Sequence, residues 1–188
     1  MKSKNLSGFS SILLLIAAGL IVVSLFFPWW RLDFFAPQYP EGLELVVYPN
    51  KLEGDINNIN SLNHYIGMAE FCQEDFPEFQ FLPFILIGLA LIVGIGAIVR
   101  RKGYLYFLIG LFVVGGIIGL MDLKLRLDQY SKNLDPMAPI DYEPFSIPIV
   151  GGNVIANFNT YSLFGVGIYF ATVAFILLLI PLWKDRKK

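Results

Sequence analysis

The chain of 188 residues is 56% hydrophobic and only 15% charged, with a formal net charge of −1. A soluble domain of this length needs far less apolar surface, so an integral membrane protein is the first expectation. The lack of a basic face outside the membrane argues against a nucleic-acid partner, and the single cysteine excludes an intramolecular disulfide.

Four uncharged apolar runs have the length of about 20 residues that a transmembrane helix needs. They cover residues 11–30, 81–99, 103–121 and 161–183. Buried core helices of a soluble protein are the alternative, but four such runs in so short a chain disfavour it. We therefore predict an all-α membrane fold, an antiparallel bundle of four transmembrane helices, with a small extracytoplasmic α+β cap formed by loops 31–80 and 122–160. The first run is followed by "FFPWWR" rather than by small residues, so we expect an uncleaved anchor.

Basic residues are distributed asymmetrically along the chain. Nine of the fourteen lie before the first run, in the turn 100–102 and in the tail 184–188, together with a single acidic residue, Asp185. The two long loops hold the other five basic residues and fourteen acidic ones. Because cytoplasmic segments carry the Lys/Arg excess, we expect a multi-pass protein of the cytoplasmic (inner) membrane with both termini in the cytoplasm.

The first long loop contains one predicted strand and one predicted helix. Leu43–Tyr48 is rich in β-formers and lies between a glycine and a proline. Asp55 is a suitable N-cap for an amphipathic helix that begins near Ile56. Gly67 is a position at which this helix could end, because glycine often follows the last helical turn.

The second long loop begins as a polar continuation of the third run, in which Asp122 and Arg126 can pair at a spacing of four. Prolines at 136, 139, 144 and 148 then require an extended chain, which we expect to lie across the first loop. Within the runs, small residues spaced four apart predict close helix packing inside the chain, at Ala90 with Gly94 and at Gly115 with Gly119. The absence of charged residues in the runs argues against a proton relay, an ion path or a transporter.

His64, Met68 and Cys72 are each four residues apart, so on a helix they would share one face. An imidazole with soft sulfur ligands selects Cu(I) over hard cations. Three ligands at this spacing extend over about 12 Å of helix axis, too far for one ion, so the predicted site is His64 with Met68, completed by a sulfur from Met137 or Met121. The alternative is that Met68 and Cys72 fill apolar space and that His64 bonds a backbone carbonyl.

The sequence contains no arrangement typical of an enzyme. Its single histidine has no serine or cysteine nucleophile close to it in sequence, and no phosphate loop, CxxC or haem-attachment motif is present. We therefore expect a protein that is not an enzyme and has no cofactor other than Cu(I).

Four segments of the outer loops, "APQYPEGLELVVY", "INSLNHYIGM", "NLDPMAPI" and "EPFSIPIVGGNVIANF", resemble a group of small bacterial membrane proteins. These are accessory proteins encoded with nitrous oxide reductase, especially of the atypical type, and with its copper chaperone. The resemblance covers residues 36–70 and 133–161 and is most distinctive at "APQYPxGL" and "LNHYIGM". It implies an assembly or copper-supply role in the periplasm during denitrification. It includes His64 and Met68 but not Cys72.

Two functions remain open from the sequence. In one, the protein is a membrane-anchored accessory factor whose cap receives or passes Cu(I) for an extracytoplasmic copper enzyme or its maturation machinery. In the other, it binds no metal and the cap is a docking scaffold for a reductase or its electron-transfer partners. In both, membrane lipids surround the apolar runs.

Overall fold

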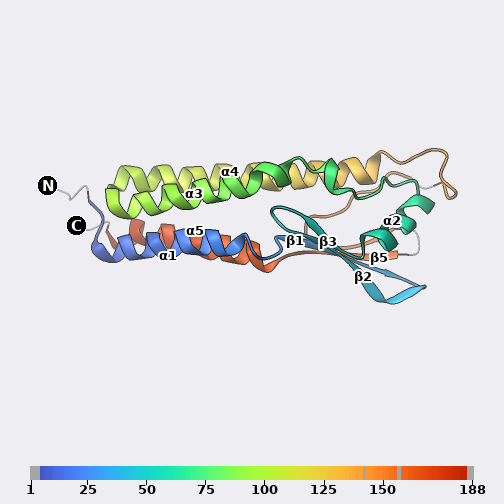
Figure 1. Ribbon diagram of the computed structural model, residues 1–188, viewed down its shortest axis with the longest axis horizontal. Coiled ribbons are helices and arrows are strands. Elements are labelled where there is room, and N and C mark those ends of the chain that lie inside the picture. The colour runs from blue at the N-terminus through green and yellow to red at the C-terminus, as the bar shows by residue number, and fades with distance from the viewer. Residues whose placement is uncertain (1–4, 142, 156–157, 186–188) are drawn as a thin grey trace.

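The computed structural model describes residues 5–141, 143–155 and 158–185. Long helices form one end of the elongated molecule and a β-sheet lies at the other end (Figure 1). The elements in chain order are α1 (Gly8–Ser24), β1 (Trp30–Ala36), β2 (Tyr39–Val47), β3 (Leu52–Gly54), α2 (Ile56–Tyr65), a 3-10 turn (Gln73–Asp75), α3 (Glu78–Val99), α4 (Lys102–Lys132), β4 (Gly151–Ile155), β5 (Phe158–Phe164) and α5 (Val166–Lys184).

The predicted all-α bundle of four transmembrane helices is wrong. The described residues contain a five-stranded antiparallel sheet in the order β3-β2-β1-β5-β4 beside five α-helices. Among these residues, only α3, α4 and α5 are long and apolar enough to cross a membrane, and α1 is a shorter apolar helix of 17 residues. The protein is therefore a membrane protein with a substantial β-sheet.

Two of the apolar runs extend past their helix to residues of the sheet, the first by Trp30 alone, which explains the error. The run 11–30 leaves its helix at Ser24, and Pro28 then disfavours helical backbone at the residue before it. The run 161–183 begins inside β5, where burial alternates along the strand, and its helix starts only after Gly165. Hydropathy sums apolar residues without regard to their period, so it merged these strands with the helices that adjoin them.

The sheet unites the two long loops into one cap. Leu32 in β1 is paired with Leu45 in β2 on one side and with Ser162 in β5 on the other. The strand predicted at Leu43–Tyr48 is confirmed and forms most of β2, which ends one residue earlier. Since β1 and β5 are separated by more than a hundred residues, this pairing requires both loops to fold together.

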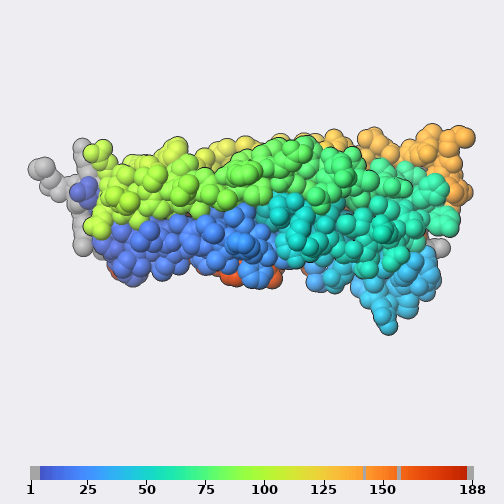
Figure 2. Space-filling model, viewed as in Figure 1, coloured from blue at the N-terminus to red at the C-terminus, as the bar shows by residue number. Residues whose placement is uncertain are grey.

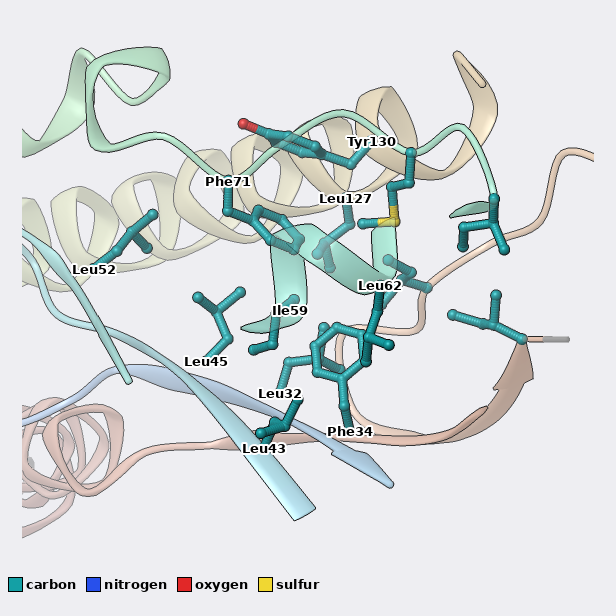
Figure 3. Packing of buried hydrophobic residues seen from close by; sticks show 14 of the residues in the cluster. Leu32, Phe34, Leu43, Leu45, Leu52, Ile59, Leu62, Phe71, Leu127 and Tyr130 are labelled. Carbon is teal, nitrogen blue, oxygen red and sulfur yellow. The ribbon is translucent and has the colours of Figure 1, made fainter. Parts of the chain in front are cut away.

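The core of the cap lies between one face of the sheet and two helices. Leu32 and Leu45 from the sheet pack with Ile59 of α2 and Leu127 of α4, and all four are buried (Figure 3). α4 supplies such contacts because it is one continuous helix that extends past its apolar part to Lys132. The predicted polar continuation is thus confirmed, and it attaches the cap rigidly to the helical part.

In the helical part, α1 lies against both α5 and α3. Figure 2 shows α1 and α3, blue and green, side by side along this part of the molecule. Ala90 is buried as predicted, but Gly115 and Gly119 are exposed and a Cβ on either would meet no atom within 4 Å. Packing within the chain therefore does not explain these two glycines.

The described parts of the three basic segments meet at the end remote from the cap. The Leu6 N–H donates to the Arg100 carbonyl at 2.6 Å, and the Ser7 N–H donates to Asp185 Oδ2 at 3.0 Å. Lys102 Nζ donates to the Asp185 carbonyl at 2.6 Å. The turn 100–102 therefore lies beside Leu6, Ser7 and Asp185, and we refer to this region as the basic end.

Candidate functional site

A pocket of about 600 Å³ lies in the cap where the end of α2 meets the segment that follows α4. We refer to it as the cap pocket. It is lined by His64, Gly67, Met68, Ala69, Glu70, Lys132, Asn133, Leu134, Asp135, Met137 and Ala138. Most of these residues belong to the "LNHYIGM" and "NLDPMAP" segments, and Ala69, Glu70 and Lys132 adjoin them, so the pocket forms where the two long loops touch.

α2 ends just before the pocket, and the chain then turns back on itself. Its last helical residue is Tyr65, and Gly67 takes a left-handed backbone conformation with φ of +74°. The Met68 N–H donates to the Asn63 carbonyl at 3.0 Å, which closes the turn. A glycine two residues past a helix commonly ends it in this way. The prediction that His64, Met68 and Cys72 share one helical face is therefore wrong, because only His64 lies on the helix.

Two asparagines of α2 hold the chain that follows the turn. Asn63 is buried and its side-chain amide donates to the Ala69 carbonyl at 3.4 Å. The Asn60 side chain accepts from the Phe71 N–H at 2.7 Å and donates to the Phe71 carbonyl at 3.2 Å. Such paired bonds satisfy backbone groups that would otherwise be buried without a partner. They fix the chain directly after Met68, although the sequence reasoning assigned neither asparagine a role.

The segment that follows α4 crosses the turn at Gly67. The Gly67 carbonyl accepts from the Asp135 N–H at 2.8 Å, and the Tyr65 carbonyl accepts from the Ile140 N–H at 3.0 Å. A Cβ at position 67 would lie 2.7 Å from the Asp135 carbonyl oxygen, so only glycine allows this approach. The Met137 N–H donates to Asp135 Oδ1 at 2.8 Å, which turns the chain and places Met137 at the pocket.

Three of the four predicted metal ligands therefore line one pocket. Met68 is almost fully buried with 3% of its surface exposed, while Met137 is 87% exposed and His64 is exposed. The imidazole comes from α2, one thioether from the turn and the other from the opposite loop. Met121, the alternative sulfur, lies on α4 and does not line the pocket.

Cys72 is not brought to this pocket. It is half-buried just before the 3-10 turn. Burial raises the pKa of its thiol, and the neighbouring carboxylates of Asp75, Glu70 and Glu74 raise it further. Because the thiolate is the form that binds metals, both its position and its ionisation separate Cys72 from the predicted ligand set.

The charges at the cap pocket favour a cation. The side chains of Glu70 and Asp135 line it, and the ammonium of Lys132 is paired with Asp128 at 2.8 Å. No group of three or more His, Cys, Asp or Glu side chains that could hold a metal occurs among residues 5–141, 143–155 and 158–185. Any metal held here would therefore depend on thioether sulfur, which is a ligand for soft ions.

No family model matches this chain, and no curated protein matches it. The structure itself defines the class, a membrane protein whose helices carry a β-sheet cap with a small pocket between its two loops. The cap pocket and the distribution of charge along the chain are therefore the features that bear on function.

Proposed function

We propose that this protein is a membrane-anchored accessory factor that holds Cu(I) in the cap pocket during maturation or copper supply of an extracytoplasmic cuproenzyme. One observation carries the proposal. The chain has one histidine and four methionines, and the histidine and two of the methionines line the same pocket. One imidazole with two thioethers is a donor set that favours Cu(I) over Zn²⁺, Ca²⁺ or Mg²⁺.

The exposure of the three ligands supports transfer rather than permanent storage. Met68 is buried in the hydrophobic core of the cap, and its N–H donates to the Asn63 carbonyl. Met137 is the most exposed of the three, so a sulfur or imidazole ligand of a partner can approach Cu(I) from its side. Replacement of Met137 by that ligand, with Cu(I) retaining its charge, passes the ion on without a redox step. The proposed role is binding and transfer, not catalysis.

The charge distribution supports an orientation. The basic end carries the Lys/Arg excess that cytoplasmic segments show, and the cap carries most of the acidic residues. We propose that the basic end, with both termini, faces the cytoplasm, and that the cap lies outside the cytoplasmic membrane. The resemblance to accessory proteins encoded with nitrous oxide reductase makes that enzyme the proposed recipient.

Competition titration of Cu(I) tests the site. The purified protein is titrated anaerobically against a chromogenic Cu(I) chelator, together with the His64→Ala and Met137→Leu variants. Both variants should bind at least tenfold more weakly, and Met121→Leu, the matched control at an exposed methionine outside the pocket, should bind as the wild type does. Wild-type binding weaker than micromolar, or equal affinity in all four proteins, would remove the copper proposal.

A metal-free docking role is the second candidate, and the free face of the sheet favours it. Val154, Tyr161 and Leu163 point away from the core on β4 and β5, and each is more than 40% exposed. A reductase or its electron-transfer partner bound on this face would be retained near the membrane. Co-purification of such a partner with a protein that fails the Cu(I) titration would favour docking over copper handling.

A further inference from the structure

A second pocket, larger than the cap pocket, lies at the basic end, and the proposed copper function does not use it. It has a volume of about 1210 Å³ and lies where the start of α4 faces the end of α5 and the residues before α1. Drug-sized ligands occupy pockets of about 300–1,000 Å³, so this one has room for a larger group. We refer to it as the basic-end pocket.

Its lining is amphipathic. Arg101 and Lys102 provide positive charge, while Phe107 and Leu182 provide apolar walls from α4 and α5. Tyr104 also lines the pocket, and its hydroxyl donates to the Ile92 carbonyl at 3.0 Å. Aromatic residues with a polar tip are typical of the level of the lipid headgroups.

Neither cation of the pocket forms an ion pair with a carboxylate of residues 5–141, 143–155 or 158–185. Arg101 is exposed and forms no ion pair with any residue that the structure describes. Lys102 uses its ammonium to donate to a backbone carbonyl, that of Asp185. The Asp185 carboxylate is itself buried, where it accepts from the Ser7 N–H and from Ser10 Oγ at 2.6 Å. The acid therefore binds Ser7, the N-cap residue of α1, and Ser10 in its first turn, and the Arg101 guanidinium stays available for a ligand.

Lys102 to Tyr104 also form the first turn of α4. The N–H groups of a first helical turn lack partners inside the helix and attract anions. Side-chain cations and an apolar wall thus meet beside the start of α4, at the end of the apolar helices, the level expected for the membrane surface.

We propose that the basic-end pocket binds the phosphate of an anionic phospholipid, with the acyl chains against the apolar walls of α4 and α5. Basic pockets between helices on the cytoplasmic side suit such headgroups. Free inorganic phosphate shares the headgroup chemistry but would leave the apolar walls unoccupied. This inference does not depend on whether the cap binds copper.

Lipid binding to the full-length protein in detergent tests the proposal. Phosphatidylglycerol, phosphatidylcholine and inorganic phosphate are each titrated, with bound lipid counted by native mass spectrometry and stability followed by thermal unfolding. The expected result is saturable binding of phosphatidylglycerol over phosphatidylcholine, weakened about fivefold in Arg101→Gln and again in Arg101→Gln/Lys102→Gln. Arg100→Gln is the matched control, because Arg100 belongs to the same turn but does not line the pocket.

Three outcomes would overturn the proposal. Equal weakening in Arg100→Gln would show attraction by overall charge rather than a site. Equal binding of phosphatidylcholine would show a non-selective lipid contact. Stabilisation by inorganic phosphate as large as that by phosphatidylglycerol would show an anion site without a role for the acyl chains.

Discussion

The Asp135 N–H donates a 2.8 Å hydrogen bond to the Gly67 carbonyl, and this contact joins the end of α2 to the segment that carries Met137. The two residues are separated by α3 and α4 in the sequence, yet they lie next to each other in the lining of the cap pocket. Pocket formation should therefore depend on the absence of a side chain at position 67.

Replacing Gly67 with alanine should damage the cap and the copper site together. The left-handed backbone costs a residue with a side chain about 1–2 kcal/mol, and the new methyl group would also contact the Asp135 backbone. We expect a lower melting temperature and weaker Cu(I) binding. Gly116→Ala is the control, since a Cβ there meets nothing within 4 Å. Equal melting temperatures for the wild type and Gly67→Ala would contradict the packing at this turn.

Cys72→Ser should leave Cu(I) affinity unchanged within about twofold, a difference well below 1 kcal/mol. The thiol does not line the pocket, and its raised pKa disfavours the thiolate that would bind a metal. The same competition titration measures the effect. A tenfold loss of Cu(I) affinity in this variant would show that Cys72 is a metal ligand.

Asp33 should make the stability of the cap depend on pH. Burial raises the pKa of this carboxyl from 3.8, nearby Glu44 adds to the rise, and Arg31 opposes it. Asp33 loses its proton more easily in the unfolded chain than in the folded protein. The buried carboxylate therefore lowers the free energy of unfolding, and this loss of stability reaches its full size above the folded pKa. It disappears as the pH falls toward 3.8.

Asp33→Asn should accordingly melt at a higher temperature than the wild type at pH 7, and the difference should shrink as the pH is lowered toward 4. Thermal unfolding in detergent between pH 4 and pH 8 measures it. Glu53→Gln is the control because the Glu53 side chain is 47% exposed. If the difference in melting temperature between Asp33→Asn and the wild type grew as the pH was lowered, folding would not raise the pKa of Asp33.

The proposed orientation predicts which end of the molecule a membrane-impermeant maleimide reaches. In a Cys72→Ser background, Met137→Cys places a thiol on the cap and Arg101→Cys places one at the basic end, and both positions are exposed. The maleimide should label only the cap thiol in cells whose outer membrane is permeabilised and whose cytoplasmic membrane is intact. It should label both thiols in lysed membranes. Labelling of Arg101→Cys alone in intact cells would reverse the orientation.

Local sequence patterns predicted the elements whose signals are short-range. The strand at Leu43–Tyr48 and the long continuation of α4 follow from β-propensity and helical period. α2 begins after Asp55 as predicted, but the Asp55 side chain does not cap it and instead accepts from the Glu44 N–H at 3.1 Å. The sheet order could not be predicted, because the pairing of β1 with β5 joins residues that no local rule relates. Arg126 illustrates the same limit, since its guanidinium pairs with Glu78 of α3 rather than with Asp122 one turn away.

The candidate site was predictable in composition but not in geometry. Residue type and spacing indicated His64, Met68 and Met137, and all three line the cap pocket. The helical arrangement was wrong because Gly67 ends α2 before Met68 is reached. Asn60 and Asn63 could have been noticed as amides repeated on one stretch of the helix, but their backbone partners become visible only once the chain is folded.

X-ray absorption at the copper edge of the Cu(I)-loaded Cys72→Ser protein tests the proposed site most directly. The account predicts a first shell of one nitrogen and two sulfur scatterers, from His64, Met68 and Met137, with one sulfur lost in Met137→Leu. A shell of nitrogen and oxygen alone, or a sulfur count unchanged by Met137→Leu, would contradict it.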